Sequence, residues 1–516
     1  MSTSIDGPGG SAASAQNDRG FFGHPWGLST LFLTEMWERF SFYGLRPLLV
    51  LFMSAALGQG GFAFERKQAA AIVGIYASSV YLASLPGGWV ADRLLGLRRA
   101  VMLGAVLISC GHLSIGLSAF VHGKVTFFIG LIFIVLGTGL LKPNISAIVG
   151  DLYPEGGARR DAGFSIFYMG INGGAVLGQT ATGFGEKYGW HLGFGAAGVG
   201  MLIGLVFFAA RSRKTLGNLG LEISRHPDPA VQARQQRTIK VALAAGLGLL
   251  ALTVVLVATG ILQIDPQAVG RKMALVLAGL AVFYFAYIFI FGGLNTDEKK
   301  RVGVIAILFL FAAVFWSAFE QAPTSLNLFA KDFTNRQFFG WEIPATWFQN
   351  VNSTFIVLLA PFFAALWLKL AKRGANPSSP AKFAFGLLFG GVGFGVMILA
   401  AYSVVASNGT IKVSPWWLVV SYIFQTMGEL CLSPVGLSSM TKLSPRKYVG
   451  QMMGIWFLAT ALGNLIAGLV GGNVDPEKLE QMPRLFIATT ASLVVAGILL
   501  AAMSPLIKKF LPNTTS

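Results

Sequence analysis

Long apolar runs recur along the whole sequence and constrain the fold more than any other feature. Each run holds about 18 residues or more, the length at which an apolar helix can cross a lipid bilayer. Only 12% of the residues are charged, about half the share found in an ordinary soluble domain. Because backbone inside a bilayer must satisfy its hydrogen bonds internally, the runs are predicted to be helices. We therefore predict an all-α polytopic membrane protein with 14 transmembrane helices.

Lys and Arg are distributed unequally between the loops that join these helices. If the N-terminus lies in the cytoplasm, 25 of the 39 Lys and Arg residues fall on the cytoplasmic side and 11 on the outer side. Basic residues concentrate in the cytoplasmic loops of membrane proteins. We therefore expect both termini in the cytoplasm. We attribute the net charge of +17 to this orientation, and we predict no nucleic-acid partner.

A short internal repeat predicts two related halves. Five residues recur 291 positions later with the same identity. They are Gly137, Pro143, Leu152, Pro154 and Gly163, matched by Gly428, Pro434, Leu443, Pro445 and Gly454. If the fourth and fifth helices of each half correspond, each half has six helices, and the runs at 240–263 and 271–293 form an inserted hairpin. Two repeated halves with a site near the midplane are a transporter design.

This repeat divides the chain into six predicted parts. They are a disordered tail (1–22), an N-terminal six-helix bundle (23–211), a cytoplasmic linker (212–239), an inserted transmembrane hairpin (240–293), a C-terminal six-helix bundle (294–507) and a C-terminal tail (508–516). The loop from Gly87 to Arg99 supports the assignment. It resembles the Gly-x-x-x-Asp-Arg-x-Gly-Arg-Arg loop of the major facilitator superfamily. Asp92 could form ion pairs with the arginines here; alternatively, the arginines only mark the cytoplasmic side.

The first span carries a stripe of charged and aromatic side chains. Their spacing places them on one face of one helix. They are Glu35, Glu38, Arg39, Phe42, Tyr43 and Arg46. Each charge costs at least about 2.5–3.5 kcal/mol in the middle of a bilayer, so the four charges must meet partners or water. We expect Arg39 to pair with Glu35, its i−4 neighbour. The stripe is either a purely structural ion network or part of a functional site.

Three further charges lie inside other spans, which favours the functional alternative. They are Lys142, Glu320 and Glu429. A medium of low dielectric constant disfavours the charged form of a carboxylate, so a carboxylate there binds protons more readily. Adjacent basic groups can pair with the carboxylate or, once it is protonated, with a substrate anion. This is the minimal equipment for proton-coupled symport. The amides Asn172 and Asn352 could bind a peptide backbone or hold helices together.

Three motifs resemble those of the proton-dependent oligopeptide transporter family. Glu35-Met36-Trp37-Glu38-Arg39-Phe40 resembles its Glu-x-x-Glu-Arg-Phe motif. The segment from Phe167 to Gly174 is similar to its Phe-Tyr-x-x-Ile-Asn-x-Gly signature, and the segment from Gly428 to Ser438 is similar to its helix-10 motif. The resemblance implies a major facilitator fold and an importer of di- and tripeptides. It would be a proton symporter of the bacterial inner membrane that works by alternating access.

The resemblance also implies roles for individual residues. The proton-coupling residues would be Glu35, Glu38, Arg39, Lys142 and Glu320. The substrate-binding residues would be Tyr43, Arg46, Tyr81, Lys142, Asn172, Trp316, Glu320, Asn352, Glu429, Ser433, Trp456 and Phe457. Arg46 and Lys142 would receive the carboxyl end of the peptide, and Glu429 its amino end. A short peptide is a zwitterion, so its site needs both signs of charge. We expect no metal, no cofactor beyond the proton, no enzymatic activity and a functional monomer in lipid.

Two departures and two rival interpretations stay open at this point. Phe42 stands where many members have tyrosine, and Ser353 stands where proline is common, so side-chain preference is open. One rival is another major facilitator protein that carries nitrate, sugars or drugs. The other is a membrane enzyme or receptor. The sequence has no His-Glu-x-x-His, Gly-x-Ser-x-Gly or Walker-type motif, which argues against hydrolysis or direct use of ATP.

Overall fold

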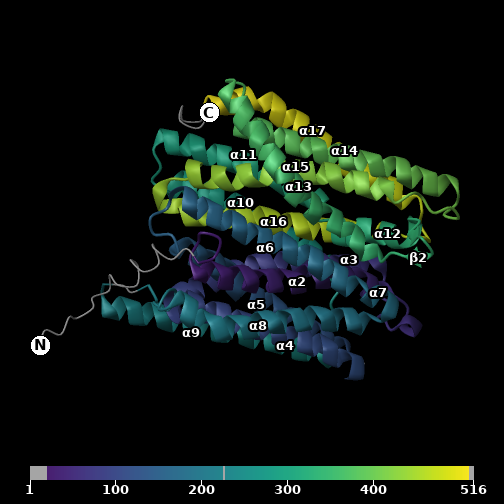
Figure 1. Ribbon diagram of the computed structural model, residues 1–516, viewed down its shortest axis with the longest axis horizontal. Helices are drawn as coiled ribbons and strands as arrows, with labels where there is room; N and C mark the ends of the chain where they lie inside the picture. Colours follow the sequence, from purple (N-terminus) through teal and green to yellow (C-terminus); the bar gives the residue numbers. More distant parts are fainter. Residues whose placement is uncertain (1–19, 122, 225–226, 511–516) are drawn as a thin grey trace, which may run out of the picture. The chain divides into compact units, whose positions relative to one another are not determined.

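A computed structural model describes residues 20–121, 123–224 and 227–510 of the chain (Figure 1). Most of the predicted N-terminal tail, 1–22, lies outside these residues, as does most of the predicted C-terminal tail, 508–516. Nearly all of the described chain is helical, and its only strands are two antiparallel strands of two residues each. The predicted all-α class is therefore confirmed.

Fourteen long helices account for the 14 predicted spans in the part of the chain described. They are α2 (Trp26–Ser54), α3 (Arg66–Val90), α4 (Leu97–Val121), α5 (Lys124–Asp151), α6 (Gly157–Gly183), α8 (Trp190–Leu216), α9 (Pro229–Ala258), α10 (Pro266–Phe291), α11 (Thr296–Phe319), α13 (Asn350–Lys372), α14 (Ser379–Ala406), α15 (Trp416–Leu443), α16 (Val449–Gly471) and α17 (Gln481–Lys508). The shorter elements are α7 (Gly185–Tyr188), α12 (Asn327–Phe333), β1 (Gln337–Phe338), β2 (Trp341–Glu342) and the single turns η1 (Leu57–Gln59), η2 (Ala91–Leu95), η3 (Ala322–Leu326), η4 (Ala345–Gln349) and η5 (Arg446–Tyr448).

Twelve of the long helices are apolar and long enough to cross a membrane, counted over the described residues. The other two are α2 and α6. Helix α2 carries the four charges of the stripe, and α6 begins with charged residues and is rich in glycine. Both are as long as the other spans, at 29 and 27 residues. The chain is therefore a multi-pass membrane protein in which one span, α2, carries four charges.

Two predicted helix limits differ from the structure. Within the predicted bundle 294–507, the apolar run at 303–330 is interrupted and does not form one helix: α11 ends at Phe319, and the wide turn η3 precedes α12. Pro323 in this turn cannot donate a backbone hydrogen bond, which explains the break. Helix α9 begins at Pro229, within the predicted linker 212–239, because the Asp228 side chain accepts a hydrogen bond from the Ala230 N–H and caps the helix there.

The chain forms two compact units. The first contains Met1–Leu45 and Leu82–Ile264, and the second contains Arg46–Tyr81 and Asp265–Ser516. The sequence had placed residues 46–81 in the bundle 23–211. This segment joins the second unit because it packs closely there: a Cβ atom added to Gly74 would lie 2.8 Å from the Cα of Gly468. The Asn327 amide also donates a hydrogen bond of 2.7 Å to the Pro47 carbonyl. The predicted hairpin is divided in the same way, with α9 in the first unit and α10 in the second.

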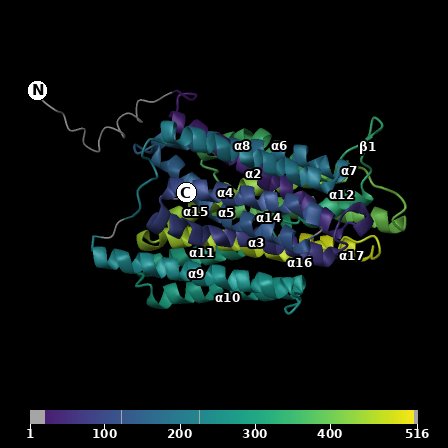
Figure 2. The same cartoon turned by 90° about the horizontal axis from the view of Figure 1, so that it is seen from below.

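The internal repeat corresponds to one packing arrangement that occurs in both units. Helices α4 and α5 pack side by side in the first unit, and α14 and α15 do so in the second (Figures 1 and 2). At each crossing, a repeat glycine meets a second glycine. A Cβ atom on Gly137 would lie 2.6 Å from the Gly104 carbonyl oxygen, and one on Gly428 would lie 2.6 Å from the Gly386 carbonyl oxygen. Only glycine permits this close approach of two helices at these positions.

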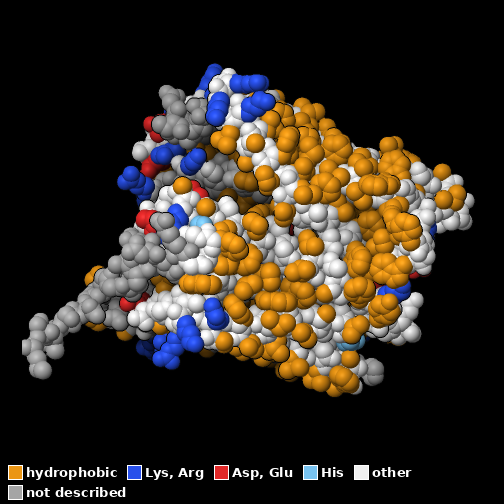
Figure 3. Space-filling model, in the orientation of Figure 1, with side chains coloured by type: hydrophobic (Ala, Val, Ile, Leu, Met, Phe, Trp, Pro, Cys, Tyr) orange, Lys and Arg blue, Asp and Glu red, His pale blue; other side chains and the backbone are white. Residues whose placement is uncertain are grey.

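Apolar side chains cover the outer faces of the helices. Figure 3 shows them along the helices of the second unit, whereas Lys and Arg gather at the end where α17 finishes. Four apolar residues of α9 are each more than half exposed: Leu247, Leu249, Leu252 and Val255. A water-soluble protein rarely exposes so large an apolar surface. The surface therefore fits a lipid environment.

Candidate functional site

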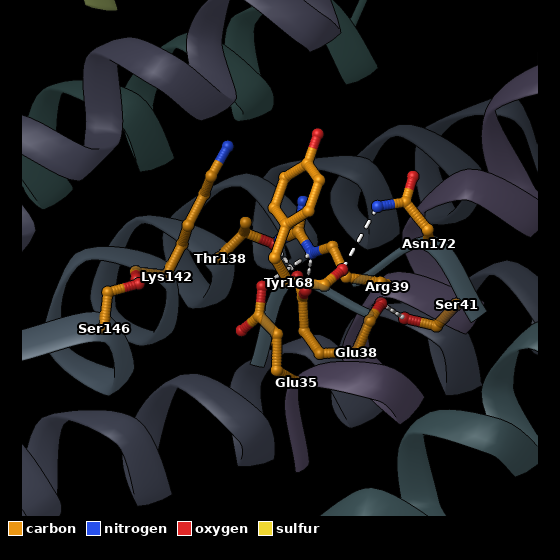
Figure 4. Close-up of polar contacts among 9 residues, drawn as sticks. All are labelled: Glu35, Glu38, Arg39, Ser41, Thr138, Lys142, Ser146, Tyr168 and Asn172. Atoms are coloured by element: carbon orange, nitrogen blue, oxygen red, sulfur yellow. Dashed lines mark hydrogen bonds and ion pairs between the residues drawn. The ribbon is translucent and has the colours of Figure 1, made fainter. Parts of the chain in front are cut away.

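A buried three-residue ion group lies in the first unit, on α2. The Arg39 Nε atom lies 3.2 Å from a Glu35 carboxylate oxygen, and it also contacts the Glu38 carboxylate (Figure 4). At most 2% of each of the three residues is exposed. The predicted pairing of Arg39 with Glu35 is therefore confirmed. The additional contact with Glu38 was not predicted, and it forms because the long Glu38 side chain reaches Nε as well.

Neutral groups complete the surroundings of this ion group. The Thr138 hydroxyl of α5 donates a hydrogen bond of 3.4 Å to Glu38. The rings of Phe42 and Tyr43 lie 5.0 and 5.8 Å from the Arg39 guanidinium carbon, within the range of a cation–π contact. Sequence reasoning did not identify Thr138. Its signal was its position four residues before Lys142, on the same face of the same helix.

Lys142 on α5 and the residues Tyr168 and Asn172 on α6 lie in the same unit. The Asn172 amide nitrogen donates a hydrogen bond of 3.1 Å to the Tyr168 carbonyl, one turn earlier on α6. The Lys142 and Tyr168 side chains extend to the same side, and the Lys142 ammonium is turned away from the Glu35 carboxylate (Figure 4). The Tyr168 residue is 47% exposed. An accessible phenol therefore lies on the same helix as Asn172, although only the motif around Tyr168 had been noted from the sequence.

The second unit contains a separate buried ion pair. The Arg46 Nη2 atom of α2 contacts the carboxylate of Glu320, which directly follows α11. The same nitrogen donates a hydrogen bond of 3.1 Å to the Asn464 side-chain oxygen of α16. All three residues are buried. The sequence predicted Arg46 and Glu320 as site residues of opposite sign but did not predict their pairing. Asn464 was missed in the sequence analysis. The feature that could have identified it is a single amide within an apolar span.

Glu429 is held by α13 in the same unit. The Asn352 amide nitrogen donates hydrogen bonds of 3.2 Å to the Glu429 carboxylate and 3.0 Å to the Thr426 hydroxyl. Thr426 lies on α15, less than one turn before Glu429. Two residues that the sequence marked as separate candidates are thus brought together. Thr426 was missed, because a threonine in a span more often bonds to its own helix, as this one also does through the Tyr422 carbonyl.

The predicted aromatic residues lie in several places of the second unit. The Tyr81 and Phe457 rings stack with 6.4 Å between their centroids, whereas Trp456 packs against Phe383. Trp316 packs edge-on against Phe319, at 5.4 Å between centroids. Its indole N–H and the Ser433 hydroxyl are buried and have no hydrogen-bond partner among the described residues. Both groups are therefore able to bond to a ligand.

These arrangements suit proton-linked binding of a charged ligand. In each unit, buried carboxylate groups contact an arginine that cannot lose its own proton. Protonation of the carboxylate removes its negative charge and leaves the guanidinium to attract another anion. Over the described residues, no three His, Cys, Asp or Glu side chains lie close enough together to hold a metal ion.

Comparison with known proteins identifies relatives over the whole chain. The sequence profile of the POT family matches residues 98–484. The peptide transporter YePEPT of Yersinia enterocolitica is 47% identical, with 100% of this chain and 99% of the relative aligned. The di-/tripeptide transporter of Lactococcus lactis subsp. cremoris is 37% identical, with 96% and 98% aligned.

A solved structure agrees with the fold as well. The crystal structure of a peptide transporter POT in complex with sulfate superposes with a TM-score of 0.88 at 40% identity, covering 98% of this chain and 100% of the other. The predicted major facilitator fold is therefore confirmed. These relatives are transporters and not enzymes, which excludes the membrane enzyme as an interpretation.

Proposed function

Because the chain belongs to the POT family, we propose that it imports di- and tripeptides together with protons by alternating access. The peptide substrate is supported by the names of the relatives in Yersinia and Lactococcus. The proton coupling is supported chiefly by one observation, the buried contact between Arg46 and Glu320. A buried pair of this kind is a poor way to gain stability, since desolvation of both charges offsets most of their attraction. A role in the transport cycle explains why it is present.

In the proposed cycle, Glu320 exchanges one proton while Arg46 keeps its charge. When Glu320 is ionised, it neutralises Arg46. When a proton binds to a Glu320 carboxylate oxygen, the charge on Glu320 disappears and the Arg46 guanidinium attracts the carboxylate of the peptide. Release of the peptide returns Arg46 to Glu320, and the proton leaves to the cytoplasm. One proton is therefore carried inward with each peptide through this group.

The other candidate residues take supporting roles in the proposal. Glu429, oriented by Asn352, binds the amino end of the peptide. Lys142 provides a further cation for the carboxyl end, and Asn172 a hydrogen bond. The group of Glu35, Glu38 and Arg39 links proton movement to the first unit. The unpartnered Ser433 hydroxyl and Trp316 indole, with the Tyr43, Tyr81, Trp456 and Phe457 rings, line the side-chain pockets.

A substrate panel tests the proposed peptide specificity. We expect unlabelled di- and tripeptides to reduce uptake of a labelled dipeptide into proteoliposomes, whereas nitrate, sugars and free amino acids at the same concentration leave it unchanged. This difference is expected because the site needs a carboxylate and an ammonium group that are separated as in a short peptide. A dipeptide with an amidated carboxyl end is the matched control and should compete poorly. Strong competition by nitrate or a sugar, with none by peptides, would contradict the proposal.

We also propose that both termini face the cytoplasm of a bacterial inner membrane, in a protein that functions as a monomer. The orientation rests on the 25 to 11 distribution of Lys and Arg. It is tested with single cysteines in a chain that lacks Cys110 and Cys431. Asn376→Cys should resist a membrane-impermeant thiol reagent applied to intact cells, whereas Gln263→Cys should react. Both positions are exposed. The reverse labelling pattern would overturn the orientation.

A further inference from the structure

We infer that Asn464 is a positioning residue for proton coupling: it holds the Arg46 guanidinium in place when Glu320 takes up a proton. The inference rests on the proposed function, since it concerns the same ion pair. Its basis is that one guanidinium nitrogen serves two acceptors. Arg46 Nη2 contacts the Glu320 carboxylate and donates to the Asn464 Oδ1 atom at 3.1 Å. An NH₂ group has two hydrogens, so each acceptor uses one of them.

The amide of Asn464 has only one orientation that satisfies both of its neighbours. Its Nδ2 atom donates a hydrogen bond of 2.9 Å to the Thr460 carbonyl, one turn earlier on α16. That carbonyl can only accept, and the Arg46 guanidinium can only donate. Exchanging the nitrogen and oxygen of the amide would therefore break both bonds. The amide oxygen is directed at Arg46 by its own helix.

Close packing between α11 and α16 fixes the distance of Asn464 from the ion pair. A Cβ atom added to Gly463 would lie 2.4 Å from the Trp316 Cβ atom, so no side chain fits between the helices at that point. Glu320 lies one turn after Trp316, and its N–H donates to the Trp316 carbonyl at 3.0 Å. Asn464, the residue next to Gly463, therefore lies close to Glu320, one turn beyond Trp316. Asn464 is only 2% exposed, so water does not replace it easily as an acceptor.

The two acceptors of Arg46 differ in how they respond to protons. Glu320 loses its charge when it is protonated, whereas an amide oxygen is the same acceptor at every physiological pH. Without Asn464, protonation of Glu320 would cost the buried guanidinium both of the acceptors named here, which is unfavourable. Asn464 therefore lowers the free energy of the protonated state. It makes the proton easier to take up and keeps Arg46 directed toward the place where the peptide carboxylate binds.

Two substitutions at this position should shift the pH dependence of transport in opposite directions. Asn464→Ala removes the acceptor, so uptake should become half-maximal at a pH about one unit lower, because a hydrogen bond to a charged group corresponds to roughly a tenfold change in proton affinity. Asn464→Asp adds a second carboxylate beside Arg46, so one proton is bound more readily, and the half-maximal pH should rise by about one unit or more. A purely structural role does not predict opposite shifts.

The measurement is the initial rate of dipeptide uptake into proteoliposomes as the outside pH is varied at constant pH difference. Asn473→Ala is the matched control, since Asn473 also donates to a carbonyl of α16, at 3.0 Å, but is not part of the ion pair. It should leave the pH profile unchanged. Equal profiles for wild type and Asn464→Ala, or shifts of the same sign in both Asn464 variants, would overturn the inference. If the aspartate variant does not reach the membrane, the sign of the alanine shift decides alone. Absence of pH-dependent uptake in the wild type would contradict the proposed function itself.

Discussion

The Glu320→Gln variant is expected to lose all accumulation of peptide against its gradient while it continues to exchange internal for external peptide. Glutamine has nearly the shape of protonated glutamic acid but cannot release a proton, so the variant resembles the loaded state. With one proton carried per peptide, a difference of one pH unit supports an accumulation of up to about tenfold in the wild type. In the variant the ratio should fall to about one. Exchange should persist because the loaded protein can reorient without releasing its proton.

The measurement compares accumulation and exchange of a labelled dipeptide in the same proteoliposomes. Glu342→Gln is the matched control, because Glu342 also pairs with an arginine, Arg336, at 2.6 Å, but is partly exposed in the short strand β2. This control should accumulate peptide as the wild type does. If Glu320→Gln still concentrates peptide, Glu320 is not the coupling carboxylate, and Glu35 and Glu38 become the first candidates.

Replacing Arg39 with methionine is expected to destabilise the fold severely. The substitution leaves the buried carboxylates of Glu35 and Glu38 without their cation. Removing one partner of a buried ion pair typically costs about 3–5 kcal/mol. We therefore expect a large loss of folded protein from the membrane and a much lower melting temperature in detergent for whatever remains.

Two comparisons separate this effect from a general intolerance of arginine loss. Arg159→Met removes a partly exposed arginine that lies 3.5 Å from Glu155, and it should change stability by at most about 1 kcal/mol. Adding Glu35→Gln and Glu38→Gln to Arg39→Met should restore much of the lost stability, since neutral amides need no cation. A melting temperature of Arg39→Met equal to that of the wild type would show that the ion group does not stabilise the fold.

The fold was predictable because its main determinant is local. Each span is a continuous apolar run, and a bilayer permits only a helix for it. The repeat glycines Gly137 and Gly428 also carried information, because both mark crossings between adjacent helices. The interruption after Phe319 was missed because the polar residues around Pro323 lie between two apolar stretches, which together resemble one long span.

Most residues of the site could be predicted from the sequence, but most of the contacts between them could not. The spacing of Glu35 and Arg39 on one helix predicts their pairing, since both lie on the same face. The pairing of Arg46 with Glu320 joins residues 274 positions apart, and helical periodicity says nothing about such distances. Asn464 was missed for a related reason: a single amide in a span usually bonds to its own helix, and only the tertiary structure reveals that its oxygen faces an arginine.

The most direct test of proton-coupled peptide import is accumulation of a labelled dipeptide in proteoliposomes under an inward proton gradient. Uptake is followed until it is constant, and a protonophore is then added. We predict that the internal concentration rises well above the external one and falls to the external level once the gradient collapses. The same protein without a gradient should only equilibrate the peptide. Accumulation that survives the protonophore, or uptake that never exceeds equilibrium under a full gradient, would contradict the account.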